Sequence, residues 1–200
     1  MITKRLRILV IDRNKVRASI IEEGLHQGGD FDVIIIEDMT HLMRHVVDAD
    51  PDVIILDLAN PDRDMLEHAL QVTRAVRRPI AMFVDTTDAA ATEAAIDAGV
   101  SAYVVDGLRK ERVKPILDMA ISRFNAVDRL KRELESAKGE LAERKMIDRA
   151  KSILMTSKGL DEQQAYQLLR KTAMNQSRKI AQVAESLVLA FNMLNDEDPK

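Results

Sequence analysis

Aspartates at the ends of short apolar runs are the first residues in this 200-residue chain that could do chemistry. Asp12 follows the run Leu6–Ile11, Asp57 follows the run Val53–Leu56, and Asp106 follows the run Ala102–Val105. Carboxylate oxygens are the ligands that a hard cation such as Mg²⁺ prefers. If the runs are parallel strands, their carboxyl ends line one functional cleft, and the acids gather there. Arg13, directly after Asp12, adds a cation to the same edge.

A second group of candidate residues is basic and lies in the last third of the chain. Between Leu141 and Leu194 there are nine Lys and Arg residues and five acids, a local charge of +4 in a chain whose net charge is −3. Such cations could contact nucleic-acid phosphates, and an aromatic ring could stack on an unpaired RNA base. A single Lys or Arg is more often a solvated surface charge, and a tyrosine is as often a packing residue, so the cluster carries the prediction. The candidates are Lys151, Arg149, Arg170, Arg178, Lys179, Lys171, Arg144 and Tyr166.

The elements that must position the aspartates alternate between apolar runs and helical patterns. Continuous runs of this length, rich in Val and Ile, are typical of parallel strands that are covered on both faces. Asp88 has the position of a helix cap, and Gly28 and Gly99 follow helical stretches. Five strand–helix units predict an α/β domain over residues 1–122, with a doubly wound five-stranded parallel sheet. The runs are Leu6–Ile11, Val33–Ile36, Val53–Leu56, Ile80–Val84 and Ala102–Val105.

From about Leu117 the pattern is helical only. Apolar residues recur at alternating spacings of three and four, which is a heptad seam and predicts a coiled-coil linker helix over 123–145 and a homodimer. The alternative is an amphipathic helix that packs on its own chain. Asp161 and Gln164 have capping-box spacing, Ser177 can cap a last helix, and a helical domain is expected over 146–194, before an acidic tail at 195–200. The seam consists of Val127, Leu130, Leu134, Ala137 and Leu141.

The layout of residues 1–122 resembles the receiver domain of two-component response regulators. That resemblance implies Asp57 as phosphoacceptor, two acids that hold Mg²⁺, a hydroxyl after the fourth strand and a lysine after the fifth. Asp12 matches the first acid, but Arg13 stands in the place of the second, Val84 in that of the hydroxyl and Asp106 in that of the lysine. We therefore expect a pseudo-receiver without phosphorylation. In it an Arg13–Asp57 ion pair replaces the metal; the alternative is that Arg13 points into solvent.

Three segments in one frame, RAKSILM (149–155), AYQLLRKTAM (165–174) and VAESLV (183–188), resemble the ANTAR domain, an RNA-binding antiterminator module found after receivers. The whole architecture, a receiver followed by a coiled coil and a three-helix ANTAR domain, is similar to the NasT and AmiR type of regulator, and most like NasT-type nitrate/nitrite assimilation regulators. The resemblance implies binding to stem-loops in leader mRNA, which prevents a terminator hairpin from forming. It also implies a ligand-sensing partner protein, a nitrate/nitrite sensor of the NasS type.

Other functional classes find little support in the sequence. Without cysteine the chain has no disulfides, thiolate zinc sites or cysteine nucleophiles. No apolar stretch reaches the length of a membrane span and no signal peptide is evident, so we expect a cytoplasmic protein. His41 and His45 have ligand-like spacing, but we predict no metal, no cofactor and no enzymatic activity. The rival hypotheses are a response regulator that depends on phosphorylation of Asp57, a purely protein-binding module and, without a clear helix-turn-helix, a DNA-binding regulator.

Overall fold

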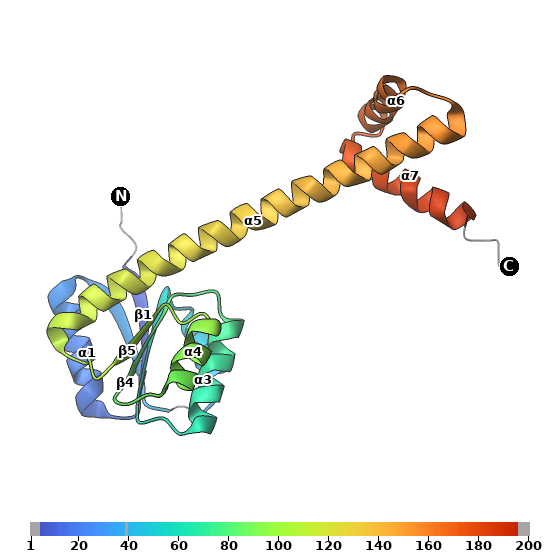
Figure 1. Cartoon of the computed structure of the whole chain (residues 1–200). Helices are drawn as coiled ribbons and strands as arrows, with labels where there is room; N and C mark the ends of the chain where they lie inside the picture. Colours follow the sequence, from blue (N-terminus) through green and yellow to red (C-terminus); the bar gives the residue numbers. More distant parts are fainter. Residues whose placement is uncertain (1–4, 39, 196–200) are drawn as a thin grey trace. The chain divides into compact units, whose positions relative to one another are not determined.

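The computed structural model describes residues 5–38 and 40–195, which fall into two units that divide after Arg129. The first unit contains the sheet, and the second is helical (Figure 1). One helix, α5 (Lys110–Lys158), begins in the first unit and ends in the second. Most of the acidic tail expected at 195–200 lies outside the described residues. Among those described, no helix combines the length and the apolar character needed to cross a bilayer.

The first unit contains five strands and the helices between them. All strand pairs are parallel, and the order β2-β1-β3-β4-β5 is that of a doubly wound sheet, which confirms the predicted fold class. The strands are β1 (Leu6–Asp12), β2 (Phe31–Ile36), β3 (Val53–Ala59), β4 (Ile80–Val84) and β5 (Ala102–Val105). The helices between them are α1 (Lys15–Gly28), α2 (Leu42–Ala49), α3 (Arg63–Ala75) and α4 (Ala89–Asp97).

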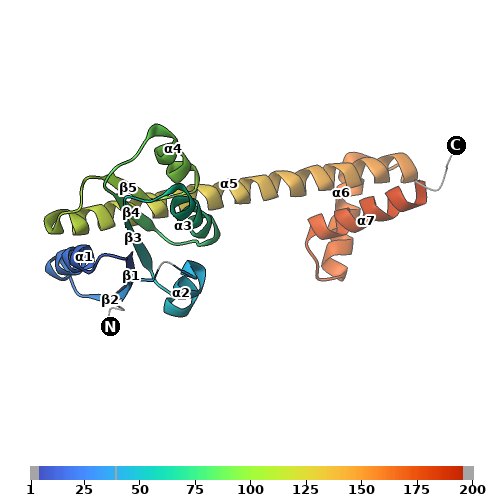
Figure 2. The same cartoon turned by 90° about the horizontal axis from the view of Figure 1, so that it is seen from below.

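Alternate residues of each strand enter two different cores. Ile8 and Val10 of β1 pack with α1 and the start of α5 on one face of the sheet. Leu9 and Ile11 pack with α2, α3 and α4 on the other face. Figure 2 shows β1 between α1 and α2. Successive side chains of a strand point to opposite faces, so the parity of a residue decides which helices it meets.

The chain order of the strands creates the edge at which the candidate acids meet. From β1 the chain goes to β2 on one side and later to β3 on the other, so the carboxyl end of β1 is a topological switch point. Asp12 of β1 is paired in register with Asp57 of β3. A register shift follows between Asp57 and Ala59, and the amide of Asp85 donates to the carbonyl oxygen of Ala59 at 2.6 Å. Three aspartates from three strand ends therefore lie at one edge.

The second unit consists of the end of α5, α6 (Glu162–Asn175) and α7 (Ile180–Asn195). The predicted capping box is confirmed. The Asp161 carboxylate accepts from the Gln164 amide at 2.7 Å, and the Gln164 side chain accepts from the Asp161 amide at 3.0 Å. The predicted Ser177 cap is wrong, because α7 begins only at Ile180, and the Lys179 amide donates to the side chain of Gln182 instead. The small core is formed by Ala150, Ile153, Leu154, Ala165, Leu169, Ala173, Val183, Ala184 and Val188.

Candidate functional site

Arg17 of α1, and not Arg13, pairs with Asp57. Its Nε donates to Asp57 Oδ2 at 2.7 Å, its Nη2 to Asp57 Oδ1 at 2.9 Å, and its Nη1 to Asp85 Oδ1 at 2.8 Å. The Asp57 side chain is 0% exposed and that of Arg17 is 18% exposed. A planar guanidinium matches a carboxylate in this bidentate way, and charge-assisted bonds of this kind are strong. Arg17 therefore pairs with two aspartates at once.

The start of α1 places Arg17 at this edge. Asn14 caps the helix, since its side chain accepts from the amides of Val16 and Arg17. Arg17 thus lies in the first turn of a helix that covers the sheet face toward which Asp12 and Asp57 point. Both aspartates share the parity of the strand residues that pack on α1.

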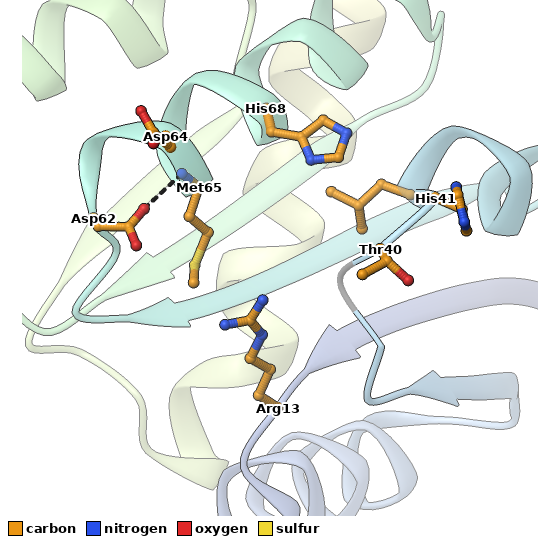
Figure 3. Close-up of a pocket in the computed structure, with 8 residues that line it drawn as sticks. Arg13, Thr40, His41, Asp62, Asp64, Met65 and His68 are labelled. Atoms are coloured by element: carbon orange, nitrogen blue, oxygen red, sulfur yellow. Dashed lines mark hydrogen bonds between the residues drawn. The ribbon is translucent and has the colours of Figure 1, made fainter.

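The predicted Arg13–Asp57 ion pair is wrong for the same geometric reason. Arg13 has the parity of Leu9 and Ile11, so it is directed to the side of α2 and α3. Figure 3 shows its guanidinium in an open cleft between the loop before α2 and the start of α3. The cleft is lined by Arg13, Thr40, His41, Leu42, Asp62, Asp64, Met65 and His68.

The two other predicted pocket residues do not reach Asp57 either. Val84 is buried in the core on the opposite side of the sheet. Asp106 is exposed and has a left-handed backbone with φ 45°, and its amide donates to the carbonyl oxygen of Val84. The residue that completes the cluster is Asp85, which the sequence analysis missed. Strand parity could have identified it, because Asp85 alternates with the buried Phe83 on the face that α1 covers.

Asp12 is the least satisfied acid of the cluster. Its side chain is buried, Oδ1 accepts from the Asn14 amide at 2.7 Å, and Oδ2 has no hydrogen-bond donor among the described residues. Burial raises the pKa of Asp12 to about 6. The Asn14 amide opposes this shift, and the charge of Asp57 adds to it. The protonated Asp12 can donate a hydrogen bond to Asp57, so this side chain gains a proton at mildly acidic pH.

The arrangement does not fit the Mg²⁺ and phosphoryl chemistry of receivers. Oδ1 of Asp57 accepts from Arg17 and from the Ala59 amide, and Oδ2 accepts from Arg17. Both oxygens that would bind a metal or attack a phosphorus atom therefore face the guanidinium. Among the described residues no group of three or more candidate side chains could hold a metal ion. Arg17 supplies within the chain the positive charge that a metal would bring.

In the second unit, two of the predicted RNA-contacting cations connect helices, and a third braces the start of α7. Lys151 Nζ lies 2.8 Å from Asp148 and 2.7 Å from Glu162, and so connects α5 with the first turn of α6. The hydrogen bond that Lys151 donates to Asp148, followed by the one that it donates to Glu162, raises the pKa of Lys151. Arg149 donates to the side chain of Asn192 in α7 at 3.2 Å.

Arg178 is likewise engaged in the chain, since it donates to Ser186 Oγ at 2.9 Å and to the carbonyl oxygen of Gln182 at 3.0 Å. Its guanidinium therefore braces the first turns of α7. A phosphate could still approach its remaining donors, but the primary contacts of this arginine are internal.

The other predicted cations present their charges outward. Arg144, Arg170, Lys171 and Lys179 are exposed, and within the described part of the chain no side-chain hydrogen bond or ion pair is found for them. Tyr166 is also exposed, and it precedes Arg170 by one helical turn on α6. One face of α6 therefore combines an aromatic ring with the exposed Arg170, and the exposed Lys171 lies on an adjacent side of the helix.

Comparison with known proteins supports the assignment of both units of the chain. Residues 135–188 match the family model of the ANTAR domain. The chain carries an ANTAR domain. It is 30% identical over 135 residues to the transcriptional regulatory protein PdtaR of Mycobacterium tuberculosis, in an alignment that covers 68% of this chain and 66% of that protein. It is 39% identical over 75 residues to the nitrate regulatory protein of Klebsiella oxytoca, which covers 38% of this chain and 19% of that protein.

The first unit of the ANTAR-domain protein has the receiver fold. The signal receiver domain of a modulated diguanylate cyclase from Desulfovibrio desulfuricans superposes with a TM-score of 0.52 at 18% identity. The superposition covers 62% of this chain and 98% of that domain. The resemblances to a receiver and to an ANTAR domain that the sequence indicated are thus confirmed.

Proposed function

We propose that this chain is a cytoplasmic, RNA-binding transcription antitermination regulator. The observation that carries the proposal is the ANTAR domain at residues 135–188, with exposed cations on α6 beside an exposed tyrosine. The protein binds stem-loops in leader mRNA and thereby keeps a terminator hairpin from forming. The two named relatives are a transcriptional and a nitrate regulatory protein, which is consistent with this role.

The RNA-contacting surface that we propose is the outer face of α6. Arg170 and Lys171 contact phosphates and fix the position of the RNA, and Tyr166 stacks on an unpaired loop base. Lys179 and Arg144 extend the basic surface. Lys151 and Arg149 contribute mainly by holding α5 to α6 and α7, and Arg178 by bracing the start of α7, because their side chains already have internal partners.

A partner protein, and not phosphorylation of Asp57, regulates RNA binding by this chain. Arg17 occupies both oxygens of Asp57, the residue through which receivers are switched by phosphorylation. A ligand-sensing partner, of the nitrate or nitrite sensor type, then sequesters or releases the regulator. The active form is a homodimer through the α5 seam.

A phosphorylation-dependent response regulator remains the second candidate, since Asp12 and Asp57 keep their places at the switch point. A phosphodonor with Mg²⁺ tests it: a change in RNA affinity that disappears in Asp57→Asn favours this candidate over control by a partner.

The proposed activity can be measured as read-through in transcription with purified RNA polymerase. The template carries two adjacent hairpins ahead of an intrinsic terminator, with loop sequences selected for binding to this protein. We expect wild-type protein to increase read-through and Arg170→Ala/Lys171→Ala to fail. Arg63→Ala/Arg109→Ala, which removes two exposed arginines from the first unit, serves as the matched control. Equal activity of both double variants would reject α6 as the RNA surface.

A further inference from the structure

The cleft that contains Arg13 lies where folds of this topology commonly bind ligands. Its walls follow the carboxyl ends of β1, β2 and β3. The strand order reverses at β1, and in open α/β sheets ligands bind in the crevice at such a switch point. The cleft has a volume of about 480 Å³, which is within the range of small-molecule sites. It opens on the side of α2 and α3, so it is separate from the Arg17–Asp57 pair on the α1 side.

The walls of this cleft carry charges of both signs. Arg13 follows β1, and its guanidinium lies between the loop before α2 and the start of α3 (Figure 3). Asp62 and Asp64 lie on the α3 side, where Asp62 caps the helix and Asp64 belongs to its first turn. Among the described residues, no hydrogen bond or ion pair is found for the side chains of Arg13 and Asp64. Both charges are therefore available to a ligand.

Neither a simple anion nor a bare metal ion suits this combination of charges. The place that a phosphate would take at the start of α3 is already filled, because Oδ1 of Asp62 accepts from the Met65 amide at 2.7 Å. Asp64 adds a second negative charge that repels an anion. For a metal ion, the described part of the chain offers no group of three or more candidate ligands. A molecule that carries one positive and one negative group matches both walls.

We propose that this cleft binds a free α-amino acid with an apolar side chain. The guanidinium of Arg13 donates to the α-carboxylate as a planar fork, and the carboxylates of Asp62 and Asp64 accept from the α-ammonium. Met65 and Leu42 supply the apolar part of the lining and contact the side chain of the ligand. All lining residues belong to the receiver-like unit, so the inference does not depend on RNA binding.

Calorimetric titration of the full chain tests the chemistry of the ligand. The probes are L-leucine, L-methionine and L-valine, the N-acetyl and amide derivatives of whichever binds most tightly, and inorganic phosphate. We expect at least one free amino acid to bind, and each derivative to bind at least about tenfold more weakly, because each lacks one charge-assisted contact. The proposal is overturned if none of the three amino acids binds, if a derivative binds as tightly as the free amino acid, or if phosphate does.

Two substitutions in the same titration test the location of the site. Arg13→Gln and Asp64→Asn each remove one charge from an exposed side chain, so the unliganded variants should unfold at the temperature of the wild type. We expect each to weaken amino-acid binding about tenfold. Arg109→Gln removes an exposed arginine that does not line the cleft, and as the matched control it should bind like wild type. Wild-type affinity in Arg13→Gln or in Asp64→Asn would show that the ligand binds elsewhere and overturn the proposal.

Discussion

Replacement of Arg17 by methionine tests the central contact of the receiver-like unit. The methionine keeps an unbranched side chain of similar reach but removes the charge and all three hydrogen bonds to Asp57 and Asp85. Asp57 is then a fully buried carboxylate beside Asp12, without a cation. Loss of one partner of a buried ion pair typically costs about 3–5 kcal/mol. Since Arg17 is partly accessible to water, we expect the lower end, about 3 kcal/mol.

The assay is thermal unfolding of the full chain by calorimetry, with the transition of the receiver-like unit as the readout. A loss of about 3 kcal/mol corresponds to a fall in Tm of about 10 °C for a unit of this size. Arg63→Met is the matched control, because the exposed Arg63 forms only an i,i+4 pair with Glu67, which is worth less than about 1 kcal/mol.

A double variant distinguishes the loss of the Arg17–Asp57 ion pair from the loss of packing around Arg17. Arg17→Met/Asp57→Asn no longer buries an unpaired Asp57 charge, and we expect it to recover more than half of the lost stability. If Arg17→Met unfolds at the same temperature as Arg63→Met, or if Asp57→Asn recovers nothing in its background, Arg17 does not neutralise Asp57 as described.

Further predictions concern Asp12, Lys151, Asp57 and the α6 surface. The folded-state pKa of Asp12 lies above its ordinary value, so its contribution to stability is lost as pH rises through about 6. Asp12→Asn should therefore gain about 1–3 kcal/mol over wild type at pH 8 and nothing at pH 4 in urea titrations; an equal gain at both pH values would contradict the ionisation. Lys151→Met should leave RNA affinity within about threefold, whereas Arg170→Ala should lower it about tenfold, because Lys151 is held in ion pairs and Arg170 is exposed. A larger loss for Lys151→Met than for Arg170→Ala in a filter-binding assay would show that Lys151, and not Arg170, contacts RNA. RNA affinity of wild type should not respond to acetyl phosphate with Mg²⁺, and Asp57→Asn should bind RNA like wild type; a response in wild type that the variant lacks would restore the phosphorylation hypothesis.

Much of the fold could be predicted because local and global signals agree. The five apolar runs all became parallel strands, and Asp88 and Asp161 cap helices as their spacing indicated, Asp88 by accepting from the Ala91 amide. Ser177 failed as a cap, because hydrogen bonding at the start of α7 is taken by Gln182, five residues later.

The candidate site was predicted only in part. The pairing of Asp12 with Asp57 follows from strand order and register, and the sequence indicated both residues. The arginine was predicted wrongly: strand parity directs Arg13 to the side of α2 and α3, whereas Arg17 reaches Asp57 from α1, the helix that covers the other face.

The charge count of the last third could not show which cations are available. Lys151 and Arg170 contribute equally to a local charge of +4, yet Lys151 is held by Asp148 and Glu162 while Arg170 is exposed. Ion pairs between helices depend on how the helices pack, and this information is not contained in the sequence pattern of one helix.

The most direct test of RNA recognition is a selection followed by an equilibrium titration. The full-length protein is offered a pool of RNAs with two adjacent hairpins and randomised loops, and a DNA pool of the same sequences, across a range of salt concentrations. We expect enrichment of RNA over DNA, with an affinity that falls as salt rises and that Arg170→Ala/Lys171→Ala abolishes. Equal binding of RNA and DNA, no enrichment at low salt, or unchanged affinity of that variant would contradict it.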